Sequence, residues 1–588
     1  MAHWSEGAKR LKINEIKVDD LGQLESIDSD DPNVWLFRLP LMRTAVDSHE
    51  SISEFRKLAQ FAKRLSDDCT VCIITSPADA AILLPYLEDH LKFQLWVALR
   101  TNPVSFVSNH QKLAENHVAL LVLTKYKKSL RHTKTRIQYT YCPACNKTTK
   151  DYGGKKHTYH EYGTLLSDVW RDIEYEPNGE LAEVGNRIAD LFGLEPNRFL
   201  HVVDLRELPM LRPKQIEQPV AILPITSNRQ SNQILLESQL INGDCLIALS
   251  DIPDDSVDFC FADPPYNLEK KYDRSDDGLE ISEYFTWCDK WLSELYRVLK
   301  PGHTLAVLNI PLWSARHFQF LSLFANFQSW IAWDGLSFPV RQIMPAHYGI
   351  VCVTKGESRQ LPLSEPSCKG SVVAMDERYC IRSGCISRRN RFGDVDRMPI
   401  TNIWSDIHRL KHNSRRVDHP CQLPPLLMER LFKTFTHSGE LILDCFNGAG
   451  TSTLVAQQIG RRFIGIELSE KYHEIAEKRH GELLGGIDPF GKTSDTPKAK
   501  NSRVQRMQKQ KYAVSKKTLQ LDVRRIANKL GRLPTKDEVR EISSFPFEYF
   551  ENYFASWGEV CAAARTTGMS ETPESPLDEI QFSLFAEN

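Results

Sequence analysis

The chain has 588 residues, a formal net charge of −2 and 14 cysteines. This length predicts several domains, and the near-neutral charge excludes a uniformly basic nucleic-acid binder. The sequence has no run of 18 apolar residues and no apolar signal-peptide core, so we expect a soluble, cytoplasmic protein with reduced cysteines.

Residues 1–30 are a polar N-terminal segment to which we assign no function. Residues 31–230 contain strand-like apolar runs that alternate with helical stretches, as in an α/β sheet. The runs lie at 34–39, 70–75, 94–99, 118–124 and 199–205. This block predicts one complete α/β domain.

A second block, residues 231–485, repeats the first. Phe93-Gln-Leu-Trp matches Phe327-Gln-Ser-Trp at an offset of 327 − 93 = 234, and Ser167-Asp-Val resembles Ser405-Asp-Ile. Collinear matches over about 170 residues favour an internal duplication over chance similarity. The first copy has Leu39-Pro-Leu-Met opposite Asp263-Pro-Pro-Tyr, and it has no glycine turn after Asp204. We infer that the first copy kept the fold and lost the reaction.

The apolar run Val257–Ala262 ends in Asp263-Pro264-Pro265-Tyr266. In open α/β sheets, ligands bind beyond the carboxyl ends of the strands. The Asp263 carboxylate and the Pro264 carbonyl can accept both hydrogens of an exocyclic amino group, which frees the nitrogen lone pair. The two prolines fix φ, and the Tyr266 ring can stack on a flipped base. The stretch predicts chemistry on the amino group of a nucleic-acid base.

A second apolar run, Leu441–Asp444, leads into a glycine-rich turn. Phe446, Gly448, Gly450 and Thr451 form a loop that lets backbone approach a ligand before a helix begins. The next strand ends in Glu467, where an acid can bind a ribose diol. The order of strand, loop, helix, strand and acid predicts a nucleoside-containing cofactor.

With these motifs, residues 234–484 resemble the β group of DNA amino-methyltransferases that use S-adenosylmethionine. The resemblance implies a Rossmann-like fold, catalytic roles for Asp263-Pro264-Pro265-Tyr266, and base flipping with direct transfer of the methyl group. It implies cofactor contacts from Phe446, Gly448, Gly450, Thr451 and Glu467, and a contact from Asp244 to the cofactor adenine. His419-Pro420 is similar to the segment that leads into the cofactor helix, although Cys421 departs from the usual continuation.

The target base is less constrained by the sequence than the reaction. Asp263, rather than serine, before Pro-Pro-Tyr is more typical of adenine-N6 enzymes in this family, and cytosine-N4 methylation is the alternative. Two alternatives of another class are an RNA methyltransferase and a catalytically silent DNA-binding scaffold. An intact Asp-Pro-Pro-Tyr motif argues against the scaffold.

The family places target recognition in the insert at residues 356–401, which contains Arg382, Arg388, Arg389 and Arg391. Arginines suit guanine edges and phosphates, and they are equally common on solvated faces. Residues 486–517 form a basic linker, and residues 518–566 a small all-α unit that resembles the homing-endonuclease-associated repeat. Residues 567–588 are an acidic tail. We expect duplex DNA to be the main partner, in a nucleoid-associated protein without a membrane partner.

The first copy carries Cys142-x2-Cys145 and His157-x2-His160 within residues 142–160. Two thiolates and two imidazoles suit tetrahedral zinc, and the segment has too few apolar residues to fold alone. This pattern predicts a zinc knuckle, with exposed histidines as the alternative. Two further expectations are a cognate restriction or defence protein, from the family, and a first copy that replaces the second subunit of a dimer.

Overall fold

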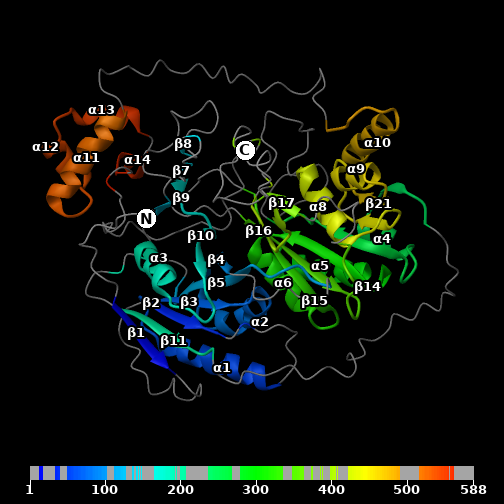
Figure 1. Ribbon diagram of the computed structural model, residues 1–588, viewed down its shortest axis with the longest axis horizontal. Helices are drawn as coiled ribbons and strands as arrows, with labels where there is room; N and C mark the ends of the chain where they lie inside the picture. Colours follow the sequence, from blue (N-terminus) through cyan, green and yellow to red (C-terminus); the bar gives the residue numbers. More distant parts are fainter. Residues whose placement is uncertain are drawn as a thin grey trace.

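The computed structural model contains two α/β sheets and a separate group of C-terminal helices (Figure 1). It describes residues 12–17, 34–39, 41, 49–101, 111–126, 135–137, 141–142, 145, 147–148, 164–192, 194, 199–206, 236–267, 279–335, 347–362, 372–374, 385, 387, 397–405, 407, 422–490, 516–554, 556–561 and 564. We call the described parts of residues 12–206 the first unit and those of residues 236–490 the second unit.

The first unit is built on a seven-stranded sheet with the order β1-β11-β2-β3-β5-β4-β10. In that order the strands are Lys12–Lys17, Phe199–Asp204, Val34–Arg38, Thr70–Thr75, His117–Thr124, Lys92–Thr101 and Val169–Tyr175. β5 is antiparallel to both of its neighbours, and the other pairs are parallel. The helices are α1 (His49–Arg64), α2 (Pro77–Glu88) and α3 (Ala182–Phe192).

The second unit is built on an eight-stranded sheet with the order β12-β21-β20-β13-β14-β16-β15-β19. In that order the strands are Gln239–Asn242, Arg462–Glu467, Leu441–Asp444, Val257–Ala262, Leu299–Asn309, His347–Thr354, Asn326–Asp334 and Ile403–Trp404. The helices are α4 (Cys245–Ser250), α5 (Ile281–Val298), α6 (Pro311–Leu321), α8 (Pro425–Phe435), α9 (Thr451–Gln458) and α10 (Glu470–Leu484). From β20 to β19 the strands follow the order of β11 to β10 in the first unit, and β16, like β5, is antiparallel to both neighbours.

Residues 12–17 form an edge strand, which the sequence did not predict within the polar segment at residues 1–30. β1 (Lys-Ile-Asn-Glu-Ile-Lys) pairs in parallel with β11, at the position that β21 holds beside β20. An edge strand has one side in water, so it needs no continuous apolar run. The two isoleucines of β1 are enough to cover its buried side. In the second unit this strand follows β20 in the chain, whereas in the first unit it comes from the far N-terminal end.

Strand pairing also corrects the predicted match between Ser167-Asp-Val and Ser405-Asp-Ile. Val169 lies opposite Ala98, and Ile403 lies opposite Ala332. Ala98 and Ala332 are related by the offset already found in the sequence (332 − 98 = 234), so Val169 corresponds to Ile403 and the offset continues through these strands. The short sequence match was not enough to fix the register of a short edge strand.

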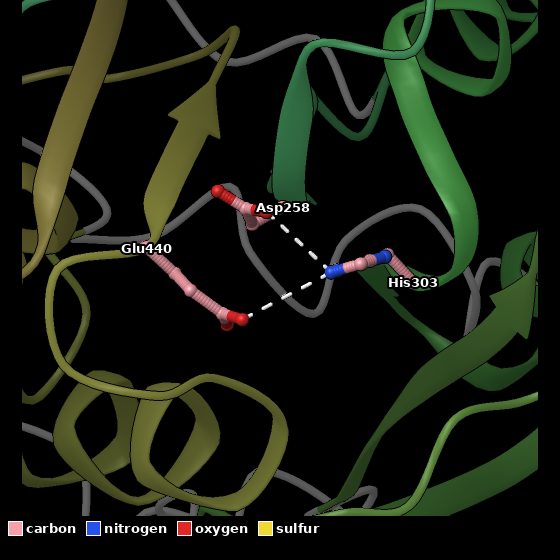
Figure 2. Close-up of side chains that lie close together, drawn as sticks. All are labelled: Asp258, His303 and Glu440. Atoms are coloured by element: carbon pink, nitrogen blue, oxygen red, sulfur yellow. Dashed lines mark ion pairs between the residues drawn. The ribbon is translucent and has the colours of Figure 1, made fainter. Parts of the chain in front are cut away.

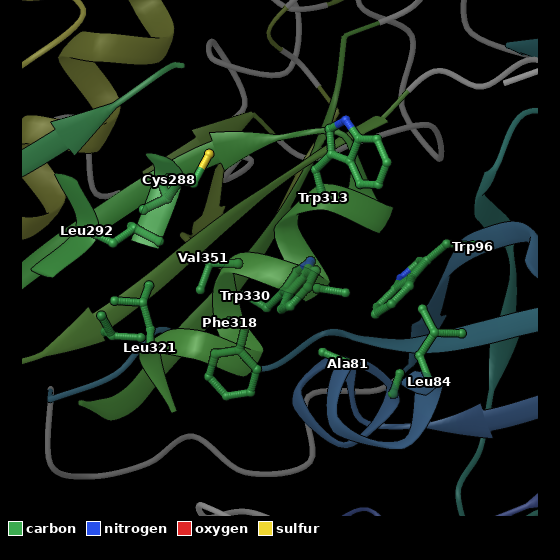
Figure 3. Close-up of a cluster of buried hydrophobic side chains, with 14 of the residues drawn as sticks. Ala81, Leu84, Trp96, Cys288, Leu292, Trp313, Phe318, Leu321, Trp330 and Val351 are labelled. Atoms are coloured by element: carbon green, nitrogen blue, oxygen red, sulfur yellow. The ribbon is translucent and has the colours of Figure 1, made fainter. Parts of the chain in front are cut away.

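The two units pack against each other through α2 and α6 and the strands beneath them. Trp96 of β4 stacks on Trp330 of β15, with ring centroids 5.1 Å apart and planes at 9° (Figure 3). The two tryptophans are related by the same offset (330 − 96 = 234), so equivalent positions meet, as they do at a two-fold axis. Ala81 and Leu84 of α2 belong to the same continuous apolar cluster as Phe318 of α6.

The C-terminal helices are α11 (Lys516–Leu530), α12 (Lys536–Ile542), α13 (Phe547–Tyr553) and α14 (Trp557–Cys561), and they share a core of their own. Gly531, with φ +70°, follows α11, and a capping box between Thr535 and Glu538 begins α12. Within the described residues, no helix combines the length and apolar character needed to span a membrane.

Three short antiparallel pairs lie outside the main sheets. They are β6 (Arg136–Ile137) with β9 (Thr164–Leu165), β7 (Tyr141–Cys142) with β8 (Lys147–Thr148), and β17 (Val372–Ala374) with β18 (Arg397–Pro399). The β7–β8 pair places Cys142 in a strand and Cys145 in the turn that follows. His157 and His160 lie outside the described residues, so the zinc knuckle stays a prediction.

Candidate active site

The second sheet brings the two polar strand ends to one edge. β13 and β20 are parallel neighbours, and Phe261 pairs with Asp444. Asp263 therefore lies just beyond the level of Asp444. The Asp-Pro-Pro-Tyr stretch and the glycine-rich loop therefore follow neighbouring strand ends.

The Asp-Pro-Pro-Tyr loop is held by side chains from two helices. Trp313 Nε1 on α6 donates to the Tyr266 carbonyl at 2.9 Å, and the Tyr284 hydroxyl on α5 donates to the Pro265 carbonyl at 2.7 Å. Among the residues that the structure describes, none donates to the Pro264 carbonyl. That carbonyl is available to accept a hydrogen bond, and its role in holding an amino group stays a prediction.

Tyr266 lies differently from the expectation that its ring is open to a base. Its hydroxyl donates to Asp263 Oδ1 at 2.7 Å, and the residue is only 5% exposed. Its ring packs against that of Tyr348, at 6.1 Å and 39°. The sequence could not show the packing of Tyr266 against Tyr348, because Tyr348 lies in β16, a strand that is distant from the motif in the chain. A base can stack on Tyr266 only after this side chain moves.

Asn267 closes the loop on its far side. It has φ +53°, and its side-chain amide exchanges two hydrogen bonds of 2.8 Å with the backbone of Leu279. These bonds join the two ends of residues 268–278. The clamp holds the end of the Asp-Pro-Pro-Tyr loop next to the residues that begin α5.

The glycine-rich loop has a geometry that requires glycine. Gly448 and Gly450 both have positive φ, 51° and 81°. A Cβ on Gly450 would lie 2.9 Å from the Ala476 Cβ of α10. Asn447 supports the loop from within, because its backbone N–H donates to the Ile466 carbonyl at 2.9 Å and its Oδ1 accepts from Thr453. Thr451, the first residue of α9, is buried behind the loop.

Glu467 and Asp244, two predicted cofactor contacts, also hold the backbone. Glu467 Oε2 accepts from the Gly448 N–H at 2.7 Å, and its Oε1 accepts from the Ser469 N–H at 2.8 Å. Asp244 caps α4 by accepting from the Leu246 N–H at 2.8 Å. Glu467 ends β21 and Asp244 follows the end of β12, and these two strands are parallel neighbours. Both acids therefore lie at the edge of the sheet that holds the glycine-rich loop.

Asp444 is a further candidate residue that the sequence analysis did not single out. It ends β20, accepts from the Phe446 N–H at 2.9 Å and from the Ser452 hydroxyl, and is 3% exposed. Burial raises the pKa of Asp444 to about 6, and burial also raises the pKa of nearby Glu467. The signal was present, because Asp444 shortly precedes the glycines of the loop. A buried acid, Asp444, beside a half-buried one, Glu467, favours a cationic ligand.

The aromatic surroundings of Phe446 were also not predicted. Its ring contacts Trp287 at 5.7 Å and Trp291 at 5.2 Å, both on α5. These contacts pack Phe446 of the loop against α5. Helix α5 therefore supports both loops of the site, here through its tryptophans and at Pro265 through Tyr284.

The first unit has a cation at the equivalent place. Asp204 and Arg206 correspond to Asp444 and Phe446 through one common offset (444 − 204 = 446 − 206). Arg206 hydrogen-bonds through its guanidinium to the Asp204 carboxylate, and Arg38 at the end of β2 lies 3.8 Å from it. Burial acts to raise the pKa of Asp204, but Arg206 and Arg38 together lower it. In the first unit the protein's own cations thus neutralise the acid, whereas no cation among the described residues pairs with Asp444.

Several predicted residues lie outside the described part of the chain. They are Arg382, Arg388, Arg389 and Arg391 of the recognition insert, and the His419-Pro420 segment with Cys421. Their roles stay predictions.

At the opposite end of the strands, Asp258, His303 and Glu440 form a cluster of potential metal ligands, the one such group found in the described residues (Figure 2). The Asp258 carboxylate already accepts from Lys300 at 2.6 Å and from the Leu441 N–H at 2.8 Å. Glu440 accepts two hydrogen bonds from the guanidinium of Arg359. Lysine and arginine side chains satisfy both carboxylates, so the cluster is accounted for without a metal ion. Its contacts link β13 with β14 and with the start of β20.

Residues 257–478 match the family described as DNA methylase. The type II methyltransferase M.HpaI of Haemophilus parainfluenzae is 30% identical over 258 residues, which are 43% of this chain and 77% of that protein. The chain belongs to the DNA methylase family. The matched residues contain Asp263, Asp444, Glu467 and the glycine-rich loop.

Two other relatives match about two fifths of this chain. The type II methyltransferase M.BamHI of Bacillus amyloliquefaciens is 34% identical over 240 residues, which are 39% of this chain and 54% of that protein. The chain thus spans about half the length of M.BamHI. The DNA adenine methyltransferase YhdJ of Escherichia coli (strain K12) is 28% identical over 41% of this chain and 81% of that protein.

Proposed function

We propose that this methylase transfers a methyl group from S-adenosylmethionine to the exocyclic N6 of adenine in duplex DNA. The observation that carries the proposal is the pairing of β13 with β20, which places Asp263 beside the glycine-rich loop. An acceptor for an amino group and a cofactor loop at adjacent strand ends suit transfer between two bound molecules. Membership of the DNA methylase family supports DNA as the substrate.

The site fits S-adenosylmethionine by charge and shape. The cofactor carries positive charge on its sulfonium and its ammonium group, and when bound it supplies an electrophilic methyl group. Asp444, buried and without a cationic partner among the described residues, is suited to that positive charge. Gly448 and Gly450 let the loop backbone approach the ligand, and Glu467 and Asp244 can bind the ribose and the adenine.

Asp263 and the Pro264 carbonyl are proposed to hold the target amino group. Each can accept one of its two N–H hydrogens, and this geometry turns the nitrogen lone pair toward the cofactor. The Tyr266 hydroxyl occupies Asp263 Oδ1 in this structure. We infer that an entering base displaces it, which frees the carboxylate and opens the ring for stacking in one movement.

Adenine is favoured by two observations. Asp263 stands before Pro-Pro-Tyr, and YhdJ, which is an adenine methyltransferase by name, aligns over 81% of its length. Cytosine-N4 methylation uses the same geometry and is the second candidate. The recognition-insert arginines and the C-terminal helices are proposed to contact DNA, which would place the protein at the nucleoid. A cognate restriction or defence protein and the zinc knuckle stay proposals.

We also propose that the first unit is a degenerate methyltransferase copy that acts as a built-in dimer partner. The equal strand order and the stacking of Trp96 on Trp330 at equivalent positions support it. The Asp204–Arg206 pair supports loss of cofactor binding, because the guanidinium supplies the positive charge that a cofactor would bring. The first unit then contributes surface and support rather than turnover.

The experiment combines purified protein, methyl-labelled S-adenosylmethionine and unmethylated mixed-sequence duplex DNA, followed by hydrolysis and identification of the labelled base. Asp263→Ala tests the acceptor role, and Asp204→Asn in the first unit is the matched control. Label in N6-methyladenine that is lost only in Asp263→Ala supports the proposal. Label in N4-methylcytosine would mean that cytosine, rather than adenine, is the target base. Label in RNA in a parallel reaction, with none in DNA, would reject DNA as the substrate.

A further inference from the structure

We propose that Asp168 of the first unit is a positioning residue for the catalytic site of the second unit, acting through His347 and Tyr348 on Tyr266. The inference rests on the proposed function of Tyr266 and Asp263. It assigns to the first unit a specific contribution to the reaction, beyond its packing surface.

Asp168 binds the start of β16 by two bonds. Its Oδ2 lies 2.9 Å from His347 Nδ1, and its Oδ1 accepts from the His347 backbone N–H at 3.2 Å. Both side chains are buried, at 4% and 1% exposed. The first residue of β16 is thus held in place by the other unit.

A second contact from the first unit holds the neighbouring strand end. Arg171 of β10 lies 3.3 Å from the carboxylate of Asp334, which is fully buried. Asp334 is the residue of β15 that pairs with His347. Both strands that end at this point are therefore bound by charged side chains from the first unit.

His347 is followed by Tyr348, which forms part of the catalytic wall. The Tyr348 ring stacks on Trp333 at 5.2 Å and 28°, and it also contacts the ring of Tyr266 at 6.1 Å. The Tyr266 hydroxyl in turn donates to Asp263. A shift at His347 would move Tyr348, and with it the surface against which Tyr266 rests or from which it moves away.

The contact between the units is nearly symmetric in its backbone. Asp168 and Asn402 are related by the offset that relates Ala98 to Ala332 (402 − 168 = 332 − 98). The Asp168 carbonyl accepts from the Ala98 N–H, and the Asn402 carbonyl accepts from the Ala332 N–H, both at 2.8 Å. Asp168 and Asn402 therefore hold equivalent places beside the two sheets.

The two histidines beside them are also equivalent. His117 pairs with Arg100 of β4, and His347 pairs with Asp334 of β15. Arg100 and Asp334 share the same offset (334 − 100 = 234), so each histidine lies at the same place in its own sheet. The result is two related contacts, one on each side of the interface between units.

At the related contact, Asn402 stands at the position that corresponds to Asp168, so an amide replaces the acid. This difference between the two contacts is the basis of the inference. Asn402 Oδ1 accepts from the Asn116 N–H at 2.7 Å beside His117. That contact lies near Leu41, which follows β2 in the stretch that replaces Asp-Pro-Pro-Tyr, because Leu41, His117 and Asn402 line one cavity. The carboxylate with its two acceptors stands on the side where the held strand adjoins Asp-Pro-Pro-Tyr. Interface stability alone would not require this difference.

The test compares Asp168→Asn with Asn402→Ala in the full chain. Asparagine removes the negative charge beside His347 and replaces one of the two carboxylate oxygens by an N–H₂ group, so only one acceptor remains for the two contacts. We expect kcat for methyl transfer to unmethylated duplex DNA to fall about 10- to 100-fold in Asp168→Asn, as for other residues that orient a reacting group. The dissociation constant of S-adenosylmethionine and the melting temperature should stay within the range of Asn402→Ala, whose kcat should remain near that of the original protein.

An unchanged kcat in Asp168→Asn, or an equal fall in Asn402→Ala, would overturn the inference and leave the proposed function intact. If the original protein transfers no methyl group to DNA, the proposed function fails, and hydrogen exchange then decides the positioning link. Faster exchange of the amides at 347–354 and 263–267 in Asp168→Asn alone supports the link, and equal exchange in both variants rejects it.

Discussion

Asp444 shows how a single buried carboxylate sets the pH range of a proposed cofactor site. Burial raises its pKa to about 6, so it takes up a proton as the pH falls below 6. A cationic cofactor binds the ionised form. We expect the dissociation constant of S-adenosylmethionine to be about tenfold larger at pH 5 than at pH 7. Calorimetric titration measures this dissociation constant at each pH. Asp444→Asn should bind S-adenosylmethionine weakly, and its dissociation constant should depend much less on pH.

The same carboxylate should reduce the stability of the ligand-free protein. A folded-state pKa raised from 3.8 to about 6 means that folding favours the protonated form. Asp444 contributes stability below pH 3.8, and that contribution is lost as the pH rises through 6. The difference is about 3 kcal/mol at pH 8, before lost hydrogen bonds are counted. We therefore expect Asp444→Asn to raise the free energy of unfolding at pH 8 by about 1–2 kcal/mol in urea titrations.

Asp204 is the matched control for this prediction. Arg206 and Arg38 lower its pKa, so its ionised form stabilises the fold above the unfolded pKa. Asp204→Asn should lower stability at pH 8, the opposite sign to Asp444→Asn. A destabilised Asp444→Asn would show that hydrogen bonds to Ser452 and Phe446 outweigh the cost of burying the charge.

Among the elements, the turn between β20 and α9 depends most directly on one residue. Gly450 combines φ +81° with a close approach to α10, so Gly450→Ala adds backbone strain and a clash with Ala476. We expect a loss of about 2–4 kcal/mol in the free energy of unfolding and loss of cofactor binding. Gly486 has φ +79° with open space around it, so Gly486→Ala should cost only about 1 kcal/mol and leave binding unchanged. Similar losses in both variants would remove the packing argument.

The elements that the sequence predicted are those whose side chains alone determine them. β13 and β20 are buried on both faces, so they appear as continuous apolar runs ending in polar residues. The sequence did not predict β1, because an edge strand requires few apolar residues. The predicted alignment of Ser405-Asp-Ile with Ser167-Asp-Val was wrong, because only two residues form β19. The packing of Tyr266 against Tyr348 and the approach of Arg38 to Asp204 depend on tertiary contacts. No local pattern reports these contacts.

At the scale of the whole molecule, the two units share one apolar cluster, and this should make their unfolding cooperative. Trp96 lies within that cluster at the contact between units, whereas Trp170 lies in a cluster made only of first-unit residues. Both tryptophans are nearly fully buried, so replacing either by alanine should cost about 3–5 kcal/mol in the unit that carries it.

The two substitutions should differ in cooperativity. Trp96→Ala removes the stacking partner of Trp330, so it should weaken the link between units and split one calorimetric transition into two. Trp170→Ala leaves that contact in place, and a single transition at lower temperature is expected. In Trp96→Ala, adding S-adenosylmethionine should then raise the transition temperature of the second unit only. In Trp170→Ala it should raise the temperature of the single shared transition. A single transition in both variants would mean that the polar contacts at Asp168 and Asn402, rather than the aromatic stack, couple the units.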